Sequence, residues 1–421
     1  MTTRPSIHDA GWAYSDDTSF QAALASFLDA LPTRPRLLGL GEPMHGEEAF
    51  PQLRNRVFQY LVEHEGYRSI AIESDCVAGL MVDDYIAEGA GSLDDVMKRG
   101  FSHGFGKSAA NRELVEWMRD YNQGQPGDDR LRFFGFDAPT EITGAPSPRL
   151  VLTALYDYLA PHVDIDRRPC TFDAIDALIG DDERWTHPDA MMDPSQSVGS
   201  SSDVAKLRLI TDDLLALLTS ESPHLVSATS PADWRLAHFH GRTAAGLLRY
   251  HATMADTSPA RWQRLMSMRD AMMSDNLNAI AANQARQGPT LVFAHNLHLQ
   301  RHRSDCQMGD QTLEWWSAGA IIDPRIGDHY AVIASALGSA QHHGVDTPGE
   351  DTVEGILCTL PEDHYVLDSR RLAAALDATE SEPIRRPDQR TGDGYFFALD
   401  PDHLAETDGV IFTKNIASSS A

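Results

Sequence analysis

The eight residues GEPMHGEE combine three carboxylates and one imidazole directly after the apolar run LLGL. They extend from Gly41 to Glu48. An imidazole titrates near neutral pH, and a neighbouring carboxylate fixes its tautomer and strengthens it as a base. The segment is therefore interpreted in one of two ways. It is either a solvated acidic turn that caps the next helix, or a catalytic loop at the end of a strand.

Reactive side chains also follow three other apolar runs. RSIAIESD contains Glu73, LRFFGFDA ends near Asp137, and TLVFAHN ends with His295 and Asn296, shortly before His298. Apolar runs separated by helical stretches are typical of parallel strands that are buried on both faces. Because ligands bind outside the carboxyl ends of such strands, four strands with this pattern predict one shared site.

These residue types suit acid–base chemistry on a bound water. We expect Glu42 or Glu73 to hold His45, which leaves its other ring nitrogen free to deprotonate the water. His295 would then donate a proton to the developing oxyanion or the leaving group. Arg54, on the helix after the loop, would pair with a carboxylate or steady the oxyanion. The glycine-rich segment GFSHGFGKS adds His103 as a further site candidate.

The sequence lacks the motifs of several other chemistries. It contains no G-x-S-x-G, no H-E-x-x-H, no Walker A motif and no G-x-G-x-x-G after a predicted strand. Strand-end glutamates and histidines are nevertheless acceptable ligands for zinc or manganese. On the residues alone, a metal-dependent hydrolase and a natural-product lyase or cyclase stay open as alternatives. A binding module that retains the pocket without catalysis is a third.

The elements needed to position this site are predicted by the hydrophobic pattern. FPQLRNRVFQYLVEHEGY and NRELVEWMRDYN are amphipathic helices between predicted strands. We therefore predict an α/β fold with a mostly parallel central sheet flanked by helices. Residues 1–146 and 288–421 would form the α/β catalytic core, and the mainly helical residues 147–287 would form an insertion.

The composition of the chain indicates which classes of partner are unfavourable and in which cellular compartment we expect the protein. The chain has 421 residues, with 35 basic and 62 acidic side chains and a formal charge of -27. Such a surface repels phosphate backbones and anionic lipids, which argues against nucleic-acid and membrane partners. There is no apolar signal segment, no apolar run near the roughly 20 residues of a membrane span, and no C-x-x-C pair. We expect a cytoplasmic protein, and the sequence does not indicate its oligomeric state.

Five motifs, in order along the chain, resemble those of the erythromycin esterase family. The resemblance begins near residue 37 and reaches the C-terminal DGVIF segment. Each motif is short, but five in the same order are fairly specific. They are G-E-P-M-H-G (Gly41 to Gly46), A-I-E ending at Glu73, W-M-R-x-Y-N (Trp117 to Asn122), F-x-G-F-D (Phe133 to Asp137) and A-H-N-x-H (Ala294 to His298).

The resemblance implies a hydrolase that uses a histidine base to activate water for cleavage of a small-molecule ester or macrolactone. It implies neither a serine nucleophile nor a required metal or other cofactor. The expected catalytic residues are His45, Glu42, Glu73, His295 and Arg54. The expected substrate-binding residues are His298, His103 and Asn296. The segment GFSHGFGKSAANREL is glycine-rich where aromatic residues are expected, so the resemblance supports the catalytic groups more strongly than erythromycin as the substrate.

Overall fold

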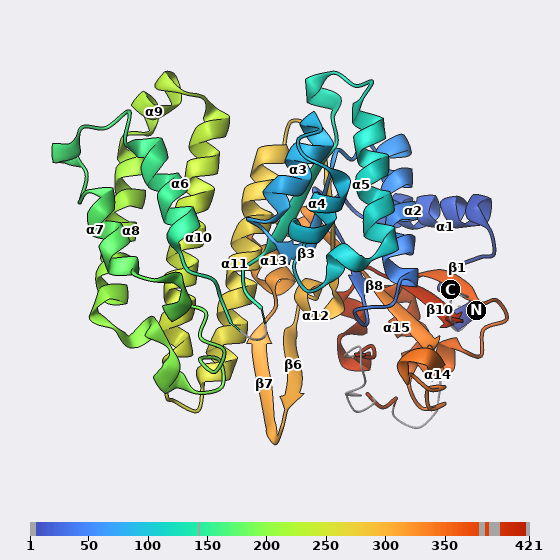
Figure 1. The fold of residues 1–421 in the computed structure, drawn as a ribbon. Helices are drawn as coiled ribbons and strands as arrows, with labels where there is room; N and C mark the ends of the chain where they lie inside the picture. The colour runs from blue at the N-terminus through green and yellow to red at the C-terminus, as the bar shows by residue number, and fades with distance from the viewer. Residues whose placement is uncertain (1–5, 142–143, 379–383, 387–395, 418–421) are drawn as a thin grey trace. The chain divides into compact units, whose positions relative to one another are not determined.

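The computed structural model describes residues 6–141, 144–378, 384–386 and 396–417. The chain forms two compact units. The first comprises Met1–Phe136 and Met273–Ala421, and the second comprises Asp137–Met272. The first unit contains a sheet with helices packed on it, and the second is helical (Figure 1).

Among the described residues, the first unit has one eight-stranded sheet, in the order β1-β9-β10-β8-β2-β5-β3-β4. Strand β2 pairs in parallel with β5 and β8, β3 with β5, and β10 with β8. Strand β9 is antiparallel to both of its neighbours, β1 and β10. The predicted α/β class with a mostly parallel sheet is thus confirmed. The strands are β1 (Gly11–Tyr14), β2 (Leu37–Glu42), β3 (Ser69–Asp75), β4 (Arg132–Asp137), β5 (Thr290–His295), β8 (Tyr330–Ser339), β9 (His364–Asp368) and β10 (Gly409–Asn415).

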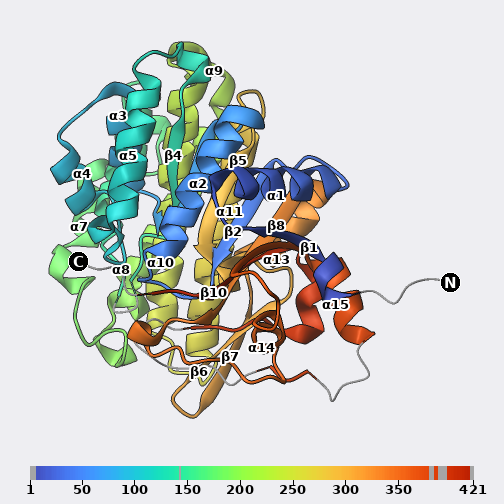
Figure 2. The same ribbon diagram turned by 90° about the vertical axis from the view of Figure 1, so that its right-hand side faces the viewer.

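Side chains that alternate along the central strands build a core on each face of the sheet. Leu38 and Leu40 of β2 contribute to one face, whereas Leu37 contributes to the other. The first face is covered by α1 (Asp17–Ala30), α2 (Ala49–His64), α3 (Gly79–Glu88), α4 (Leu93–Arg99) and α5 (Ala109–Asn122). The second is covered by α11 (Arg261–Gln284) from Met273 onward, α12 (Asn296–Leu299), α13 (Ala318–Ile326), α14 (Val353–Leu357) and α15 (Ser369–Asp377) (Figures 1 and 2).

Local sequence signals explain where the helices near the future site begin and end. Helix α2 follows the loop directly, and the Glu47 carboxylate accepts a hydrogen bond from the N–H of Ala49 at its first turn (3.0 Å). It ends before Gly66, which has the left-handed φ of 74° that favours glycine. Helix α5 begins after Ser108, whose hydroxyl accepts from the N–H of Asn111.

The second unit is built from helices that pack around buried aromatic and aliphatic side chains. The Trp185 side chain is fully buried, and its indole N–H donates to the carbonyl of Ile179 (3.0 Å). This unit extends from Asp137 to Met272, whereas the insertion expected from the sequence covers residues 147–287. Its helices are α6 (Arg149–Leu159), α7 (Phe172–Ile179), α8 (Ser202–Ser220), α9 (Ser222–Ala228), α10 (Pro231–Met254) and the first half of α11.

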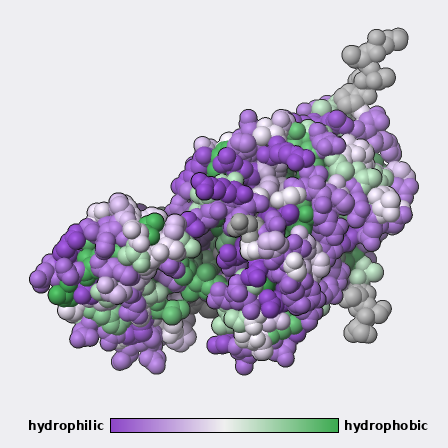
Figure 3. All heavy atoms as spheres, turned by 90° about the horizontal axis from the view of Figure 1, so that it is seen from above, coloured by the Kyte–Doolittle hydropathy of each residue, from purple (hydrophilic) through white to green (hydrophobic). Residues whose placement is uncertain are grey.

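A separate hairpin and the surface complete the description. Strands β6 (Arg303–Met308) and β7 (Gln311–Trp316) pair with each other in a two-stranded antiparallel sheet. The face of the molecule in Figure 3 is mainly hydrophilic, as expected for a chain with 62 acidic residues. Within the described residues, none of the helices combines the length and apolar character that crossing a membrane requires.

Candidate active site

The carboxyl ends of three central strands bring the predicted site residues together. Strand β5 lies between β2 and β3 in the sheet. The register pairs Glu42 with His295 across β2 and β5, and it pairs Ile72, the residue before Glu73, with Phe293 of β5. All three strands run in the same direction, so Glu42, Glu73 and His295 emerge at the same edge of the sheet.

The imidazole of His45 is held between two buried carboxylates. Its Nδ1 lies 2.7 Å from Oε1 of Glu42, and its Nε2 lies 3.7 Å from Oε1 of Glu73. The first distance is a strong hydrogen bond and the second is too long for a direct one. The His45 side chain is 32% exposed, against 5% and 2% for the two carboxylates, so the ring is the part of this group that substrate and solvent can reach.

Burial and charge act on His45 and Glu42 in opposite ways. Burial by itself lowers the pKa of His45, but the negative charge of Glu73 and the hydrogen bond to Glu42 outweigh it, and the pKa is raised. Burial raises the pKa of Glu42, and the hydrogen bond from His45 opposes that rise. The site therefore favours a basic imidazole, as a general base requires.

Glu73 connects the three histidines of the site. Its Oε2 accepts a hydrogen bond from the backbone N–H of His295 (2.8 Å). Its Oε1 lies 3.3 Å from Nε2 of His298, and this is the same oxygen that approaches His45. The His298 side chain is 7% exposed, so it lies behind the carboxylate rather than at the surface.

The ring of His295 is fixed by backbone groups on both sides. Its Nδ1 accepts from the N–H of Leu297 (3.2 Å), so its Nε2 carries the proton and donates to the carbonyl of Pro43 (3.2 Å). Burial lowers the pKa of His295 to about 3, and the neighbouring His45 adds to the effect. In this geometry both ring nitrogens of His295 are hydrogen-bonded to backbone groups, so the ring has no proton directed at a substrate. The role of proton donor that the sequence suggested for His295 is therefore not favoured. This geometry favours a role in holding the Pro43 carbonyl.

Arg54 places a buried positive charge near the carboxylates of Glu42 and Glu48. Its side chain is completely buried, donates to Asn111 Oδ1 (2.7 Å) and to Asn55 Oδ1 (2.7 and 3.1 Å), and lies over the ring of Phe293. Among the described residues, no carboxylate lies within ion-pair distance of the guanidinium. Burial lowers its pKa to about 9, which still leaves it charged at neutral pH, and the charge of Glu42 opposes the lowering. A guanidinium has five N–H donors, so donors remain for a ligand.

Glu42, His45, Arg54 and Glu73 line one cavity of about 320 Å³, whereas the side chains of His295 and His298 are not part of its lining. His103 also lines it, and its φ of 55° is the left-handed conformation that residues other than glycine rarely adopt. Five of the residues predicted from the sequence therefore meet around this cavity, and His298 joins them through Glu73. The lining includes Glu42, His45, Glu47, Glu48, Arg54, Glu73, His103 and Phe105.

Asn296, which we expected to bind substrate, does not line this cavity. Its side-chain amide donates to the carbonyl of Ser335 on β8 (2.9 Å), and its Oδ1 accepts from the N–H of Ser335 (3.3 Å). The same Oδ1 lies only 2.0 Å from where a Cβ on Gly41 would be. Asn296 therefore joins β5 to β8, and the glycine that opens GEPMHGEE leaves room for it.

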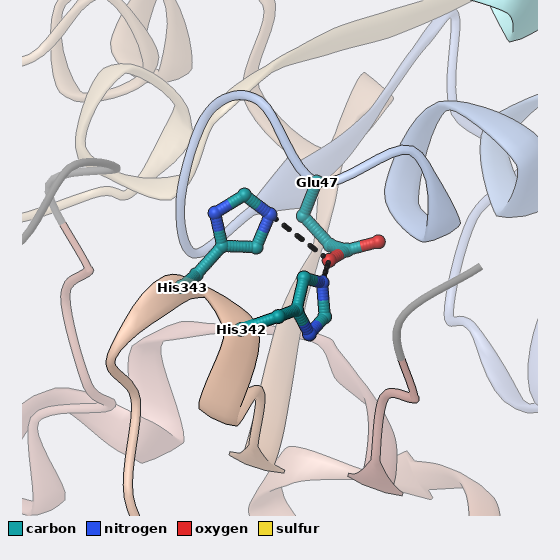
Figure 4. A group of neighbouring side chains, drawn as sticks. All are labelled: Glu47, His342 and His343. Carbon is teal, nitrogen blue, oxygen red and sulfur yellow. Dashed lines mark hydrogen bonds and ion pairs between the residues drawn. The ribbon is translucent and has the colours of Figure 1, made fainter. Parts of the chain in front are cut away.

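Sequence reasoning did not single out two glutamates of the loop and their partners. Glu48 Oε2 accepts hydrogen bonds from the Ser108 hydroxyl and from the Ala110 N–H (both 3.0 Å), which ties the loop to the start of α5. Glu47 faces His342 and His343, two consecutive histidines beyond the end of β8 (Figure 4). The pair HH shortly after the strand segment HYAVIASAL was the available signal, because other strands of this chain also end in reactive residues.

The protein thus has an α/β fold in which a histidine is hydrogen-bonded to one buried carboxylate and close to a second, at the carboxyl edge of a parallel sheet. This arrangement is chemically able to carry out acid–base catalysis. The erythromycin esterase family matches residues 62–416, which is most of the chain, and the protein therefore belongs to that family. Membership supports a hydrolase of this type. The match begins inside α2, so GEPMHGEE lies outside it.

Three solved structures share the fold, each at 16% sequence identity. A protein from Bacillus cereus has a TM-score of 0.68, with 95% of this chain and 92% of that chain covered. A succinoglycan biosynthesis protein has a TM-score of 0.67, with 97% and 95% covered. A mutant of the erythromycin esterase EreC in its open conformation has a TM-score of 0.64, with 95% and 94% covered. At this identity the likeness concerns the fold.

Proposed function

We propose that the protein hydrolyses an ester or lactone bond of a small molecule, with His45 as the general base. The observation that carries the proposal is the 2.7 Å contact between His45 Nδ1 and Glu42 Oε1. Because the carboxylate accepts the proton of Nδ1, the lone pair of Nε2 is left for a water molecule on the cavity side. Membership of the erythromycin esterase family supports the same reaction class.

In the proposed reaction, His45 Nε2 takes a proton from water while the water oxygen attacks the carbonyl carbon of the substrate. A tetrahedral oxyanion forms, and the imidazole becomes an imidazolium between Glu42 and Glu73. Both carboxylates stabilise that positive charge, since Glu73 Oε1 lies 3.7 Å from Nε2. Collapse of the intermediate breaks the bond to the alkoxide, which takes the proton from Nε2. The products are a carboxylic acid and an alcohol.

Arg54 and His298 are given supporting roles in this proposal. The guanidinium of Arg54 has no paired carboxylate among the described residues and lines the cavity, so it suits the negative charge that develops on the carbonyl oxygen. His298 lies 3.3 Å from Glu73 Oε1, so it orients the carboxylate that faces His45. His295 takes the positioning role described above rather than that of proton donor.

The substrate is proposed only at the level of chemical class. A cavity of about 320 Å³ is at the lower end of the sizes typical for small-molecule sites, which favours a compact ester or lactone. The name of one structural relative contains erythromycin esterase and that of another contains succinoglycan biosynthesis, although the two share this fold. Macrolides therefore form one arm of the test, and small esters and lactones form the other.

The test is product analysis by mass spectrometry in water enriched in oxygen-18. Wild type and His45→Ala are each incubated with a panel of macrolides, lactones and simple esters. We expect one labelled oxygen in the acid product with wild type, and a rate lower by about 100- to 10,000-fold with His45→Ala. His64→Ala is the matched control, because His64 is an exposed histidine at the end of α2.

Each outcome bears on a different part of the proposal. Turnover of macrolides by wild type alone would identify the substrate class, and turnover of small esters alone would retain the mechanism with another substrate. Undiminished hydrolysis by a folded His45→Ala variant would remove His45 from the role of base. Conversion of a substrate without incorporation of the label would favour a lyase or cyclase over a hydrolase.

A further inference from the structure

A second cluster of ionisable side chains lies beside the cavity and takes no part in the chemistry above. It consists of Glu47, His342 and His343 (Figure 4). Glu47 Oε2 lies 2.7 Å from Nε2 of His342 and 3.2 Å from Nε2 of His343. All three donor atoms lie within 4.8 Å of one another. Two imidazole nitrogens thus converge on one carboxylate oxygen.

We propose that Glu47, His342 and His343 bind a divalent transition-metal ion of the zinc class. Zinc takes imidazole nitrogen and carboxylate oxygen at about 2.0–2.2 Å, which places two ligands of a tetrahedral ion about 3.3 Å apart. The observed separation of 3.2 Å matches that spacing, and the one of 2.7 Å needs the Glu47 and His342 side chains to move apart by about 0.6 Å when the ion binds. Two histidines and one glutamate form a donor set that favours zinc over magnesium or calcium.

The ligands are already oriented by groups outside the cluster. Glu47 Oε1 accepts a hydrogen bond from the Ala49 N–H (3.0 Å), which turns Oε2 towards the histidines. Such an outer hydrogen bond is common for carboxylates that bind metals. The Glu47 side chain is 8% exposed, so a bound ion would have one well-fixed ligand.

Both histidines belong to a short turn that is closed by backbone hydrogen bonds. They are the last two residues of the 3₁₀ helix η9 (Gln341–His343), which follows β8. Ala340 and Val345 exchange backbone hydrogen bonds across this turn (2.9 and 3.1 Å). The C-cap of the 3₁₀ helix is Gly344, which has a left-handed φ of 73°. The two imidazoles, 30% and 23% exposed, leave a fourth ligand position accessible to water.

The proposed ion would join two loops at the carboxyl edge of the sheet. Glu47 comes from the loop after β2, two residues beyond His45, and the histidines come from the turn after β8. Strands β2 and β8 are hydrogen-bonded neighbours, so the ion would clamp the ends of adjacent strands. This site is distinct from the strand-end glutamates and histidines considered as metal ligands from the sequence, and metal binding there does not depend on the proposed hydrolysis.

The experiment is a metal-binding measurement on the full-length protein without a polyhistidine tag. The protein is stripped with a chelator, dialysed against zinc chloride and analysed for bound metal by elemental mass spectrometry. We expect about one zinc per chain for wild type and near none for the double variant His342→Ala/His343→Ala. Cobalt substitution adds an optical signature of the ligand geometry, and thermal unfolding shows whether zinc stabilises each variant.

The chain supplies a matched control in another group of the same residue types. His302, His403 and Glu406 also lie within metal-binding reach of one another, but the glutamate is 47% exposed and the second histidine 39%. We expect His302→Ala/His403→Ala to keep its zinc. Absence of zinc from wild type would overturn the proposal. Retention of zinc by a folded His342→Ala/His343→Ala protein would also overturn it, as would loss of zinc from the control variant alone.

Discussion

Oε1 of Glu42 lies 2.7 Å from Nδ1 of His45, although Glu42 ends a buried strand and His45 lies in the loop that follows it. Only three positions separate the two residues, so the contact is set by the local path of the chain after β2. It selects the tautomer of the imidazole, because a carboxylate can only accept at Nδ1. The nitrogen that faces Glu73 is then the one without a proton.

Glu42→Gln tests this selection of the tautomer. The amide of glutamine can donate to Nδ1, which moves the ring proton to Nε2 and removes the base from the cavity side. We expect kcat to fall by about 100- to 10,000-fold with little change in KM. Nitrogen NMR of labelled imidazole distinguishes the two tautomers and should show the proton at Nε2. An unchanged kcat, or an unchanged tautomer, would mean that Glu42 does not orient the base.

Arg54→Lys separates a specific guanidinium role from simple charge. Lysine keeps the positive charge but cannot donate to both Asn55 and Asn111 with the geometry of a planar guanidinium. We expect a loss of about 100- to 1,000-fold in kcat, the usual cost of removing one donor from an oxyanion site. Thermal unfolding of the variant shows whether the fold is retained. If the folded variant keeps the wild-type kcat, Arg54 only supports the structure.

The sequence predicted the elements whose signal lies in residues that are adjacent along the chain. The strands that end near Glu42, Glu73 and His295 were recognisable because buried parallel strands are continuous apolar runs. The antiparallel strands β1 and β9 were not, because GWAY and HYVLD are short and lack a continuous apolar run. The general position of the site followed from the strand ends.

Two features could not be predicted from the sequence: the direction of a side chain, and contacts between residues that are far apart along the chain. Asn296 lies between two site histidines, yet its side chain is directed to Ser335 on β8, a choice that only the pairing of strands determines. Glu47 and His342 are 295 positions apart, so no local pattern joins them. The sequence shows a glycine at position 41, but it does not show that a side chain there would collide with Oδ1 of Asn296.

Glu354 should make the first unit less stable as the pH rises. Its carboxyl is fully buried, its Oε1 accepts from the Leu399 N–H (2.6 Å), and Oε2 has no partner among the described residues. Burial raises the pKa of Glu354 from 4.5 to about 7. The folded state thus keeps a proton that the unfolded state has lost, and the protonated form contributes stability that is fully present below pH 4.5 and is lost as the pH rises through about 7.

We therefore expect Glu354→Gln to remove part of the pH dependence of unfolding. Between about pH 5 and pH 8, wild type should lose roughly 2–3 kcal/mol of unfolding free energy that the variant retains. Urea unfolding at the two pH values measures the difference. Parallel pH profiles for the two proteins would show that Glu354 is ionised in the folded state at no cost.

His251 should affect the second unit with the opposite sign. It is fully buried, its Nε2 donates to the carbonyl of Pro146 (2.9 Å), and its Nδ1 has no partner among the described residues. Burial lowers the pKa of His251 from 6.5 to about 4. Because the unfolded state takes up the proton first, the neutral ring contributes stability above pH 6.5 that is lost as the pH falls through about 4.

His251→Gln keeps a donor for Pro146 but does not titrate. We expect wild type to lose roughly 3 kcal/mol more unfolding free energy than this variant on acidification from about pH 7 to pH 4. Circular dichroism during acid titration follows the loss of helix, and a higher acid midpoint for wild type is the expected result. Coincident acid transitions would indicate that another group controls acid unfolding.

The three glutamates of GEPMHGEE each have a different partner in the structure. Glu42 holds His45, Glu47 faces the turn after β8, and Glu48 accepts from the start of α5. A substitution that altered the loop at one of these glutamates would still have to be compatible with the contacts of the other two. The loop is therefore attached at three points and is poorly suited to gradual evolutionary change. New substrate preferences in descendants of this protein should arise at other residues that line the cavity, with GEPMHGEE inherited unchanged.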